Sequence, residues 1–333
     1  MRIIVGPCVA WLLFLSLGCG RATLVVGLGP AEQRLTETTV LKERGARGNE
    51  VALIDVSGML TTAERRGLFS VESGPVSAFT EALNKAAKDE DVKAVVVRIN
   101  SPGGTVTASE IMYRELVRFR ERTGKPAVAV MMDLATSGGY YLACGADAIV
   151  AHPTTVTGSV GVILQTVSLE PALSRIGVEA RAFTSGANKN AGSPLSTMTD
   201  EQAATLQALV DDFYDRFVGV VRERRAALPA QHLAEATDGR VVTGEQALRW
   251  KMVDRLGDLR DGFAVAKELA EIDRAYLVRY HRPLDAPGSI YASSPSGVGG
   301  VGGTDIDVNV LPIDGSLLQS APGAYYLWTG DLP

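Results

Sequence analysis

Short apolar segments alternate with helical patterns through the middle of the chain. Residues 51–56, 93–99 and 127–131 are apolar or β-branched runs, which are typical of strands buried in a core. Between the last two runs, residues 109–122 carry large apolar side chains on one stripe at helical spacing. Strands that alternate with helices predict an α/β domain with a layered, largely parallel sheet.

Local start signals mark further elements. Pro75 stands in a first helical turn, and a helix followed by a strand over residues 147–151 is expected from near Gly138. Thr199 and Thr243 are each followed three residues later by a glutamine, which is a capping-box pattern. We expect a long helix after Thr199 and a short one after Thr243.

The N-terminus has the pattern of an export signal. Residues 3–17 are nearly all apolar and follow the single charge of Arg2. The stretch is shorter than the ~20 residues that span a bilayer as a helix. It ends at Cys19 in a sequence that resembles a bacterial lipobox, so Cys19 is a candidate for lipidation. The alternative is an uncleaved membrane anchor, and both readings predict a membrane-associated, extracytoplasmic protein of a bacterial cell envelope.

The chain divides by composition into five parts. We expect a signal, lipoprotein-type or membrane-anchor segment, a tether of mixed charge, one folded domain, a flexible linker rich in glycine and serine, and an apolar tail too short for a core of its own. In that order, these parts are residues 1–19, 20–49, 50–275, 276–303 and 304–333.

Composition excludes several classes of function. A net charge of −5 gives no electrostatic reason to expect a nucleic acid partner. The three cysteines and three histidines offer neither a disulfide framework nor metal-ligand spacing. We therefore expect no metal and no cofactor.

Two glycine motifs follow predicted strands and carry candidate chemistry. Ser137 stands at a strand-to-helix turn before Gly138, where a serine is exposed and a free amide can face an oxyanion. Gly103 and Gly104 follow another strand and could present a second amide to the same oxyanion. Each motif alone is also ordinary turn chemistry.

A serine nucleophile needs a base, and the sequence leaves two kinds open. The histidines His152, His232 and His281 lie at a strand end, on a polar segment and beside the linker. Lys189 lies in a glycine-containing segment with no other charge, and a lysine can act as a base when burial lowers its pKa. Most lone lysines in polar loops are simply solvated.

Taken together, the motifs resemble the signal peptide peptidase A family in order and spacing over about residues 50–270. The motifs are Asn100-Ser101-Pro102-Gly103-Gly104, Ser137-Gly138-Gly139-Tyr140-Tyr141, Thr157-Gly158-Ser159-Val160-Gly161, Lys189 before Gly192-Ser193-Pro194, and Asp238-Gly239-Arg240-Val241-Val242-Thr243-Gly244.

The resemblance implies a catalytic dyad and a fold. Ser137 is then the nucleophile and Lys189 the base. Ser159 is a candidate for positioning the lysine amine, with a plain strand-end turn as the alternative. The implied fold is the ClpP/crotonase-like layered fold of repeated ββα units, in ring-shaped homo-oligomers whose neighbouring subunits complete each site.

The implied activity is that of a serine endopeptidase acting on peptides. We expect it to degrade cleaved signal peptides or small proteins at the extracytoplasmic face of a membrane. The alternatives are a ClpP-like protease with a histidine base such as His152, an inactive membrane scaffold of the same fold, and a crotonase-like acyl-CoA enzyme. The export signal argues against the last, because acyl-CoA pools are cytoplasmic.

The tail offers one further prediction. Residues 304–333 hold apolar, β-prone pieces: Ile306, Val308, Val310 and Leu311, then Tyr325, Tyr326, Leu327 and Trp328. Ile306, Val308 and Val310 alternate as a peptide bound by strand addition would, behind a linker that makes attachment nearly intramolecular. Docking near the substrate groove is one interpretation, and a disordered extension is the other.

Overall fold

The computed structural model describes residues 35–46, 48–63, 65–66, 71–72, 74–282, 289–291 and 325–327. The predicted signal segment, Cys19 and residues 20–34 of the tether lie outside these stretches, as do Ile306, Val308 and Val310. None of the described helices combines the length and the apolarity that crossing a bilayer requires.

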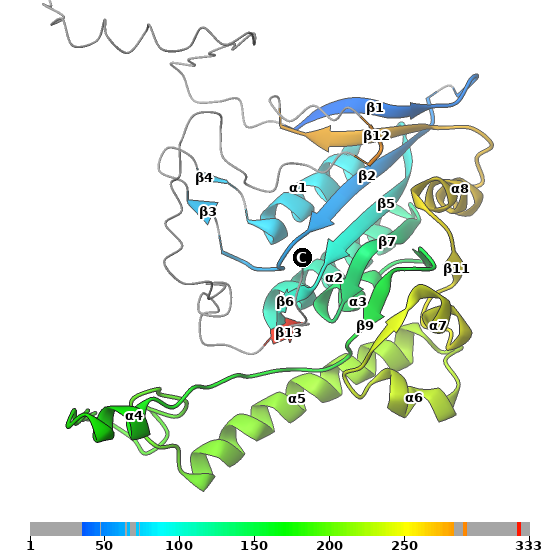
Figure 1. Cartoon of the computed structure of the whole chain (residues 1–333). Coiled ribbons are helices and arrows are strands. Elements are labelled where there is room, and N and C mark those ends of the chain that lie inside the picture. Colours follow the sequence, from blue (N-terminus) through cyan, green and yellow to red (C-terminus); the bar gives the residue numbers. More distant parts are fainter. Residues whose placement is uncertain are drawn as a thin grey trace, which may run out of the picture. The chain divides into compact units, whose positions relative to one another are not determined.

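Figure 1 shows the order of the elements. The strands are β1 (Thr36–Lys42), β2 (Glu50–Ser57), β3 (Arg65–Arg66), β4 (Val71–Glu72), β5 (Val92–Ser101), β6 (Gly103–Thr105), β7 (Ala127–Thr136), β8 (Ala148–Ala151), β9 (Val156–Gly158), β10 (Val241–Thr243), β11 (Arg255–Leu256), β12 (Tyr276–His281) and β13 (Tyr325–Leu327). The helices are α1 (Pro75–Lys88), α2 (Val106–Thr123), α3 (Gly138–Ala143), α4 (Glu170–Arg175), α5 (Asp200–Arg224), α6 (Ala230–Ala236), α7 (Gly244–Arg249) and α8 (Leu259–Leu269).

Nine of the described strands form one sheet, and most of its pairs are parallel. Its main path runs β1-β12-β2-β5-β7-β8-β11, while β9 pairs with β7 and β10 with β9. The β1–β12 and β9–β10 pairs are antiparallel, and the others in this sheet are parallel. The predicted α/β class with a largely parallel sheet is confirmed.

Alternation along the central strands sends side chains into two cores. On β5, Val95, Val97 and Ile99 belong to the core that α1, α2 and α3 cover, whereas Ala94 and Val96 face the core under α8. Successive side chains of a strand point to opposite faces, so burial on both faces requires the continuous apolar runs seen in the sequence.

The folded unit extends beyond the predicted boundaries on both sides. β1 lies inside the predicted tether, and β12 lies at the start of the predicted linker, yet the two strands pair with each other and β12 pairs with β2. β1 is a polar strand at the edge of the sheet, where one face and one row of backbone groups meet solvent. β12 contains the polar side chains of Arg279 and His281, which hid a buried strand in the sequence pattern.

A buried ion cluster explains how β12 tolerates that charge. Asp55 on β2 accepts a hydrogen bond from Arg98 at 2.6 Å and pairs with Arg279 at 2.5 Å. Arg98 also donates to the carbonyl of Ile290 at 2.5 Å. Buried charges are tolerated when they are paired and hydrogen-bonded, so the cluster joins β2, β5 and β12 across the sheet.

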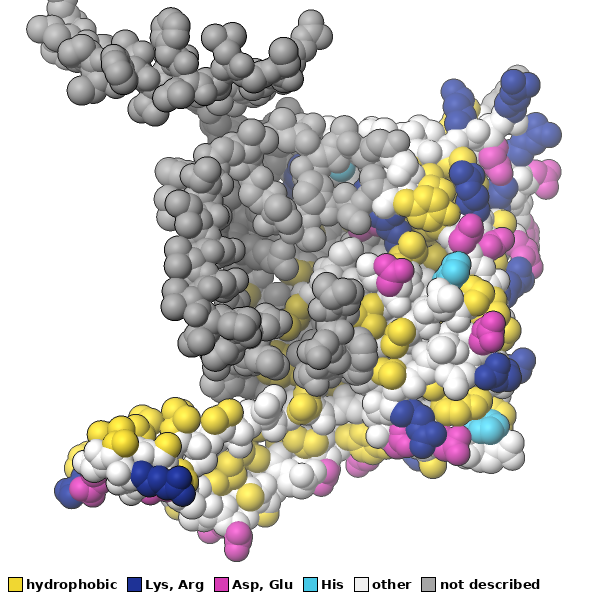
Figure 2. Space-filling model, in the orientation of Figure 1, with side chains coloured by type: hydrophobic (Ala, Val, Ile, Leu, Met, Phe, Trp, Pro, Cys, Tyr) yellow, Lys and Arg dark blue, Asp and Glu magenta, His cyan; other side chains and the backbone are white. Residues whose placement is uncertain are grey.

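Residues 164–199, here called the arm, project from the sheet between Ile163 and α5 (Figure 1). Gln202, in the first turn of α5, donates to the carbonyl of Ala187 at 2.6 Å and to the side chain of Asn190 at 3.0 Å, which ties the arm to that end of the helix. Figure 2 shows hydrophobic side chains along the arm. Large apolar residues exposed there are Val167, Leu169, Ile176, Val178, Phe183 and Leu195.

Candidate active site

Ser137 occupies a strained turn at the end of β7. It is the residue before α3, with φ 51° and ψ −114°, a conformation that side-chain-bearing residues seldom adopt. Its amide donates to the carbonyl of Gly158 at 2.8 Å, which holds the turn in place. The side chain is buried, and its hydroxyl has no hydrogen-bond partner among the described residues. An unpartnered buried hydroxyl costs free energy and points to a chemical role.

The three predicted oxyanion glycines lie together beside this serine. A Cβ on Gly103, whose φ is +104°, would lie 2.7 Å from the amide nitrogen of Gly138. A Cβ on Gly104 would lie 1.9 Å from the carbonyl oxygen of Leu60, and one on Gly138 would lie 2.3 Å from the hydroxyl of Ser109. These contacts require glycine, because any side chain would push the amides apart.

Ser101 shapes the first glycine motif. Its buried hydroxyl donates to the carbonyl of Gly58 at 2.7 Å and accepts from the amide of Gly103 at 3.1 Å. The motif follows β5 and Ser137 follows β7, so both lie at the carboxyl edge of neighbouring parallel strands. Ligands bind at this edge in open α/β sheets.

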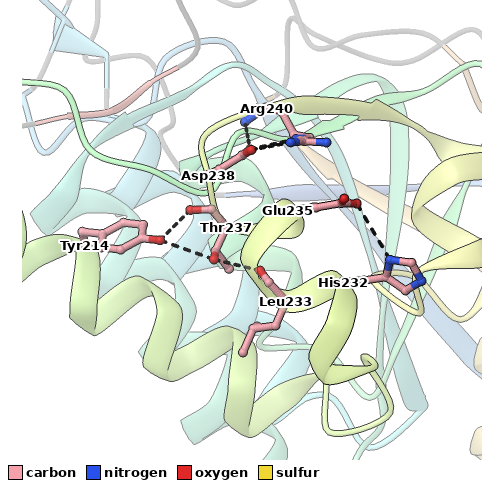
Figure 3. Close-up of polar contacts among 7 residues, drawn as sticks. All are labelled: Tyr214, His232, Leu233, Glu235, Thr237, Asp238 and Arg240. Carbon is pink, nitrogen blue, oxygen red and sulfur yellow. Dashed lines mark hydrogen bonds and ion pairs between the residues drawn. The ribbon is translucent and has the colours of Figure 1, made fainter.

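Ser159 is also buried, next to the glycine that binds the Ser137 amide. It has φ 52° and follows Gly158, whose carbonyl binds the Ser137 amide. The Ser159 amide donates to the carbonyl of Arg240 at 2.7 Å, and β10 pairs with β9 alongside. Figure 3 shows the supporting contacts: Asp238 pairs with Arg240 at 2.6 Å, and Tyr214 donates to the carbonyl of Thr237 at 2.7 Å.

Lys189 is not brought to Ser137 within one chain. It is exposed on the arm, and among the described residues no hydrogen bond joins the two side chains. The loop that carries Lys189 is hydrogen-bonded to Gln202 in the first turn of α5. Gln202 lies about 16 Å along the helix axis from Phe213, because an α-helix rises about 1.5 Å per residue. The carbonyl of Phe213 accepts a hydrogen bond from Tyr326 of β13, which pairs with β6 in the first glycine motif.

The three histidines have other partners. His152 is exposed and hydrogen-bonds Thr154 at 2.8 Å. His232 stacks on Trp250 and faces Glu235 at 3.8 Å (Figure 3), while His281 bonds the threonines of β1. No histidine among the described residues contacts Ser137.

Part of the tail pairs with the glycine motif. β13 runs antiparallel to β6, with Tyr325 opposite Thr105 and Tyr326 opposite Gly104. The tail therefore does approach the candidate site, through the second of its two β-prone pieces, whereas the alternating residues of the first lie outside the described residues. The hydroxyl of Tyr326 donates to the carbonyl of Phe213 on α5.

A charged network behind the site was not anticipated. Tyr141, four residues after Ser137, donates to Glu110 on α2, and Arg216 and Arg114 pair with the same carboxylate. Burial alone would raise the pKa of Glu110, but hydrogen bonds from Arg216, Tyr141 and Arg114 outweigh it and lower the pKa to about 2. No local pattern links residues from three separate helices, so the sequence contained no signal for it.

Two further groups are chemically notable. Burial raises the pKa of the Cys144 thiol to about 12, which makes it a poor nucleophile. The carboxylates of Glu37, Glu50 and Asp89 lie within 4.8 Å of one another at the β1 end of the sheet. Burial, followed by the charge of Glu37 and Asp89, raises the pKa of Glu50 to about 7.

A strained turn, an unpartnered serine hydroxyl and adjoining glycine amides are features typical of serine hydrolases. Comparison with known proteins identifies the family of hydrolase to which the chain belongs. The family model described as peptidase family S49 matches residues 120–273. A putative signal peptide peptidase SppA of Enterococcus faecium is 32% identical over 246 residues, which cover 74% of this chain and 70% of that protein. A putative protease of Synechocystis is 37% identical over 224 residues, which cover 67% of this chain and 76% of that one.

Among solved structures, a lysine-to-alanine mutant of a membrane-bound stomatin-specific protease, in complex with a substrate peptide, is similar. It has a TM-score of 0.43 and 16% identity, and the match covers 66% of this chain and 80% of that one. The sequence matches establish that the chain belongs to peptidase family S49 and is a serine peptidase.

Proposed function

We propose that this peptidase uses Ser137 as nucleophile and Lys189 of a neighbouring subunit as general base. Its proposed role is to degrade cleaved signal peptides or small proteins at the extracytoplasmic face of a membrane. The observation that carries the proposal is the position of Lys189, exposed on the arm while Ser137 is buried in the body without a partner. A lysine that the fold holds away from its own serine can serve a second copy of the chain.

The arm supports delivery between subunits. Its exposed apolar side chains, with Phe183 97% and Ile176 73% exposed, would be costly in water and favour packing against another protein. A head-to-tail contact of this kind closes into a ring when the rotation allows. Ser159 would then meet the incoming amine and orient it toward Ser137.

Mixing two inactive variants tests the dyad. Ser137→Ala and Lys189→Ala should each abolish cleavage of a fluorogenic peptide, and Lys88→Ala, at an exposed lysine, should not. Rings assembled from equal amounts of the two inactive variants should recover about a quarter of wild-type activity, because a site needs an intact serine from one subunit and an intact lysine from the next.

The outcomes separate the alternatives. Activity retained in Lys189→Ala would remove lysine as the base. Inactive single variants without recovery on mixing would place both residues in one chain. Wild-type protein that a fluorophosphonate probe does not label would identify an inactive scaffold.

Anchoring at the membrane is a separate proposal. The export pattern of residues 1–19 supports it, and Cys19 is the proposed lipid acceptor. Cys19→Ser should block both signal processing and lipid labelling in cells. Lipid labelling that survives the change would rule out Cys19 as the acceptor.

A further inference from the structure

Three carboxylates meet at the β1 end of the main sheet. Glu37 is on β1, Glu50 is the first residue of β2, and Asp89 directly follows α1. One oxygen of each lies within 4.8 Å of the other two. The backbone amide of Asp91 donates to the Asp89 carboxylate at 3.0 Å and fixes its orientation. In Figure 1, β1 and β2 lie on either side of β12, so the fold brings together residues that are far apart in the sequence.

The cluster carries more negative charge than its one ion pair neutralises. Lys85 of α1 pairs with Glu37 at 3.7 Å, and among the described residues no ion pair involves Glu50 or Asp89. Burial, followed by the charges of Glu37 and Asp89, raises the pKa of Glu50 to about 7. A bound cation would supply the missing positive charge and keep all three carboxylates ionised.

A buried hydroxyl without a partner lies toward the same cluster. Tyr280 of β12 stands opposite Glu37 in the β1–β12 register and is 7% exposed. Its hydroxyl has no hydrogen-bond partner among the described residues. Burial, followed by the charges of the three carboxylates, raises the pKa of Tyr280, so this phenol lies close to all of them. A buried hydroxyl left without a partner costs free energy, and its position beside the carboxylates points to a ligand there.

The spacing of the oxygens fits a divalent cation. An ion at the centre of three atoms that lie within 4.8 Å of one another is at most about 2.8 Å from each. Ca²⁺ binds oxygen ligands at about 2.3–2.6 Å in flexible geometry and accepts water in its shell, whereas Mg²⁺ needs about 2.0–2.1 Å and a near-ideal octahedron. The spacing therefore favours Ca²⁺. Glu37 is exposed, so a cation can enter from solvent.

We propose that Glu37, Glu50 and Asp89, together with the hydroxyl of Tyr280, form a binding site for a divalent cation, with Ca²⁺ preferred over Mg²⁺. The hydroxyl binds the ion directly or through a water in its shell. In the described sheet β1 pairs with β12 alone, so the ion gives this strand a second attachment, to β2 and the end of α1.

The cation site is separate from the candidate active site. Glu50 begins β2, whereas Ser137 follows β7, and β2, β5 and β7 are parallel. The two sites therefore lie at opposite ends of the strands. The sequence-based expectation of no metal relied on cysteine and histidine spacing, which does not test for oxygen ligands from separate elements.

Calcium titration of the full-length protein tests the proposal. Protein freed of metal by a chelator is titrated with Ca²⁺ at mildly alkaline pH, where the carboxylates are ionised, and Kd should lie between about 10⁻⁵ and 10⁻³ M. A hundredfold excess of Ca²⁺ over Kd should raise Tm by about 5 °C, because the folded state alone holds the site. Hydrogen exchange of the β1 amides should slow when Ca²⁺ binds.

Three variants separate the ligands from their surroundings. Glu50→Gln removes a ligand and a repelling charge, so it should weaken Ca²⁺ binding at least tenfold while its Tm without Ca²⁺ equals or exceeds the wild-type value. Tyr280→Phe keeps the ring and should weaken binding about fivefold, since one polar contact is lost. Glu90→Gln is the matched control: Glu90 is exposed, lies beside Asp89 and is outside the cluster, so its replacement should leave Kd unchanged.

Each result decides a stated part of the proposal. Lack of Ca²⁺ binding at millimolar concentration, or a rise in Tm that K⁺ at equal ionic strength reproduces, would overturn the site. Wild-type affinity in Glu50→Gln would place the bound Ca²⁺ elsewhere and overturn it as well. Unchanged affinity in Tyr280→Phe would remove the hydroxyl from the site, and equally tight Mg²⁺ would overturn the preference for calcium. Unchanged exchange of the β1 amides would refute the attachment of this strand.

Discussion

At the scale of single residues, two serines of the candidate site have strained backbone conformations. Ser137 and Ser159 both have positive φ, at 51° and 52°, and both backbone amides are bound, to Gly158 and Arg240. Such conformations cost on the order of 1–3 kcal/mol each and persist only where the surroundings determine them. Here the two backbone hydrogen bonds hold both serines in these conformations.

Gly103→Ala should abolish peptidase activity, whereas the same change at Gly219 on α5 should not. The new methyl would lie 2.7 Å from the Gly138 amide nitrogen at a φ of +104°, so it would displace the amide that we propose as an oxyanion donor. Loss of one such donor lowers kcat by about 100-fold or more. Gly219→Ala on α5, where no atom lies within 4 Å, should keep activity and gain up to about 1 kcal/mol of stability. Wild-type kcat in Gly103→Ala would contradict the role of these amides.

At the scale of elements, local signals predicted the central strands and the capped helices. The capping boxes at Thr199 and Thr243 are both formed, and β2, β5 and β7 follow the apolar runs. Caps depend on side chains within a few residues of the backbone that they bind, so the sequence contains them. The contact between α2, α3 and α5 through Glu110 depends on residues far apart in the chain, and no local pattern reports it.

Glu110→Gln should destabilise the protein in a pH-dependent way. The pKa of Glu110 is lowered from 4.5 to about 2 in the folded state. A carboxylate with a depressed pKa stabilises the folded state above its unfolded pKa, and this contribution is lost as pH falls through the folded value. The Tm difference between wild type and Glu110→Gln should therefore be largest above pH 4.5 and shrink as pH falls toward 2. Calorimetry from acid to neutral pH measures it.

Glu121→Gln is the matched control for that experiment. Glu121 lies on the same helix and is exposed, so its replacement should leave Tm near the wild-type value at every pH. A Tm difference for Glu110→Gln that stays constant down to pH 2 would contradict an ionised, paired carboxylate.

At the scale of the whole molecule, two described segments lie outside the central sheet. The arm exposes large apolar residues and carries the exposed Lys189, whereas β13 of the tail pairs with β6 in the first glycine motif. The exposed apolar residues of the arm are the basis for the subunit contact that we propose.

Phe183→Asp should break the assembly and the activity together. Phe183 is 97% exposed on the arm, and a carboxylate there would have to be desolvated in any interface that buries it. We expect a smaller mass by light scattering and a parallel loss of peptidase activity, because Lys189 is no longer delivered. Leu269→Asp, at an apolar residue that is 42% exposed on α8, should change neither. A fully active variant of normal mass would remove the arm from the interface.

The sequence by itself determined the α/β class, the central strands, the helix caps and the candidate nucleophile. These depend on periodic burial and on contacts between near neighbours, which leave a local trace. Only the tertiary structure decided that β1 and β12 belong to the sheet, that Lys189 stands apart from Ser137, and that Tyr326 is buried beside α5. Each of these depends on where distant segments lie in the fold, and at β1 and β12 a polar edge strand and a buried ion cluster also hide the apolar pattern. The free energy of such contacts comes from packing and charge pairing that only the folded chain assembles.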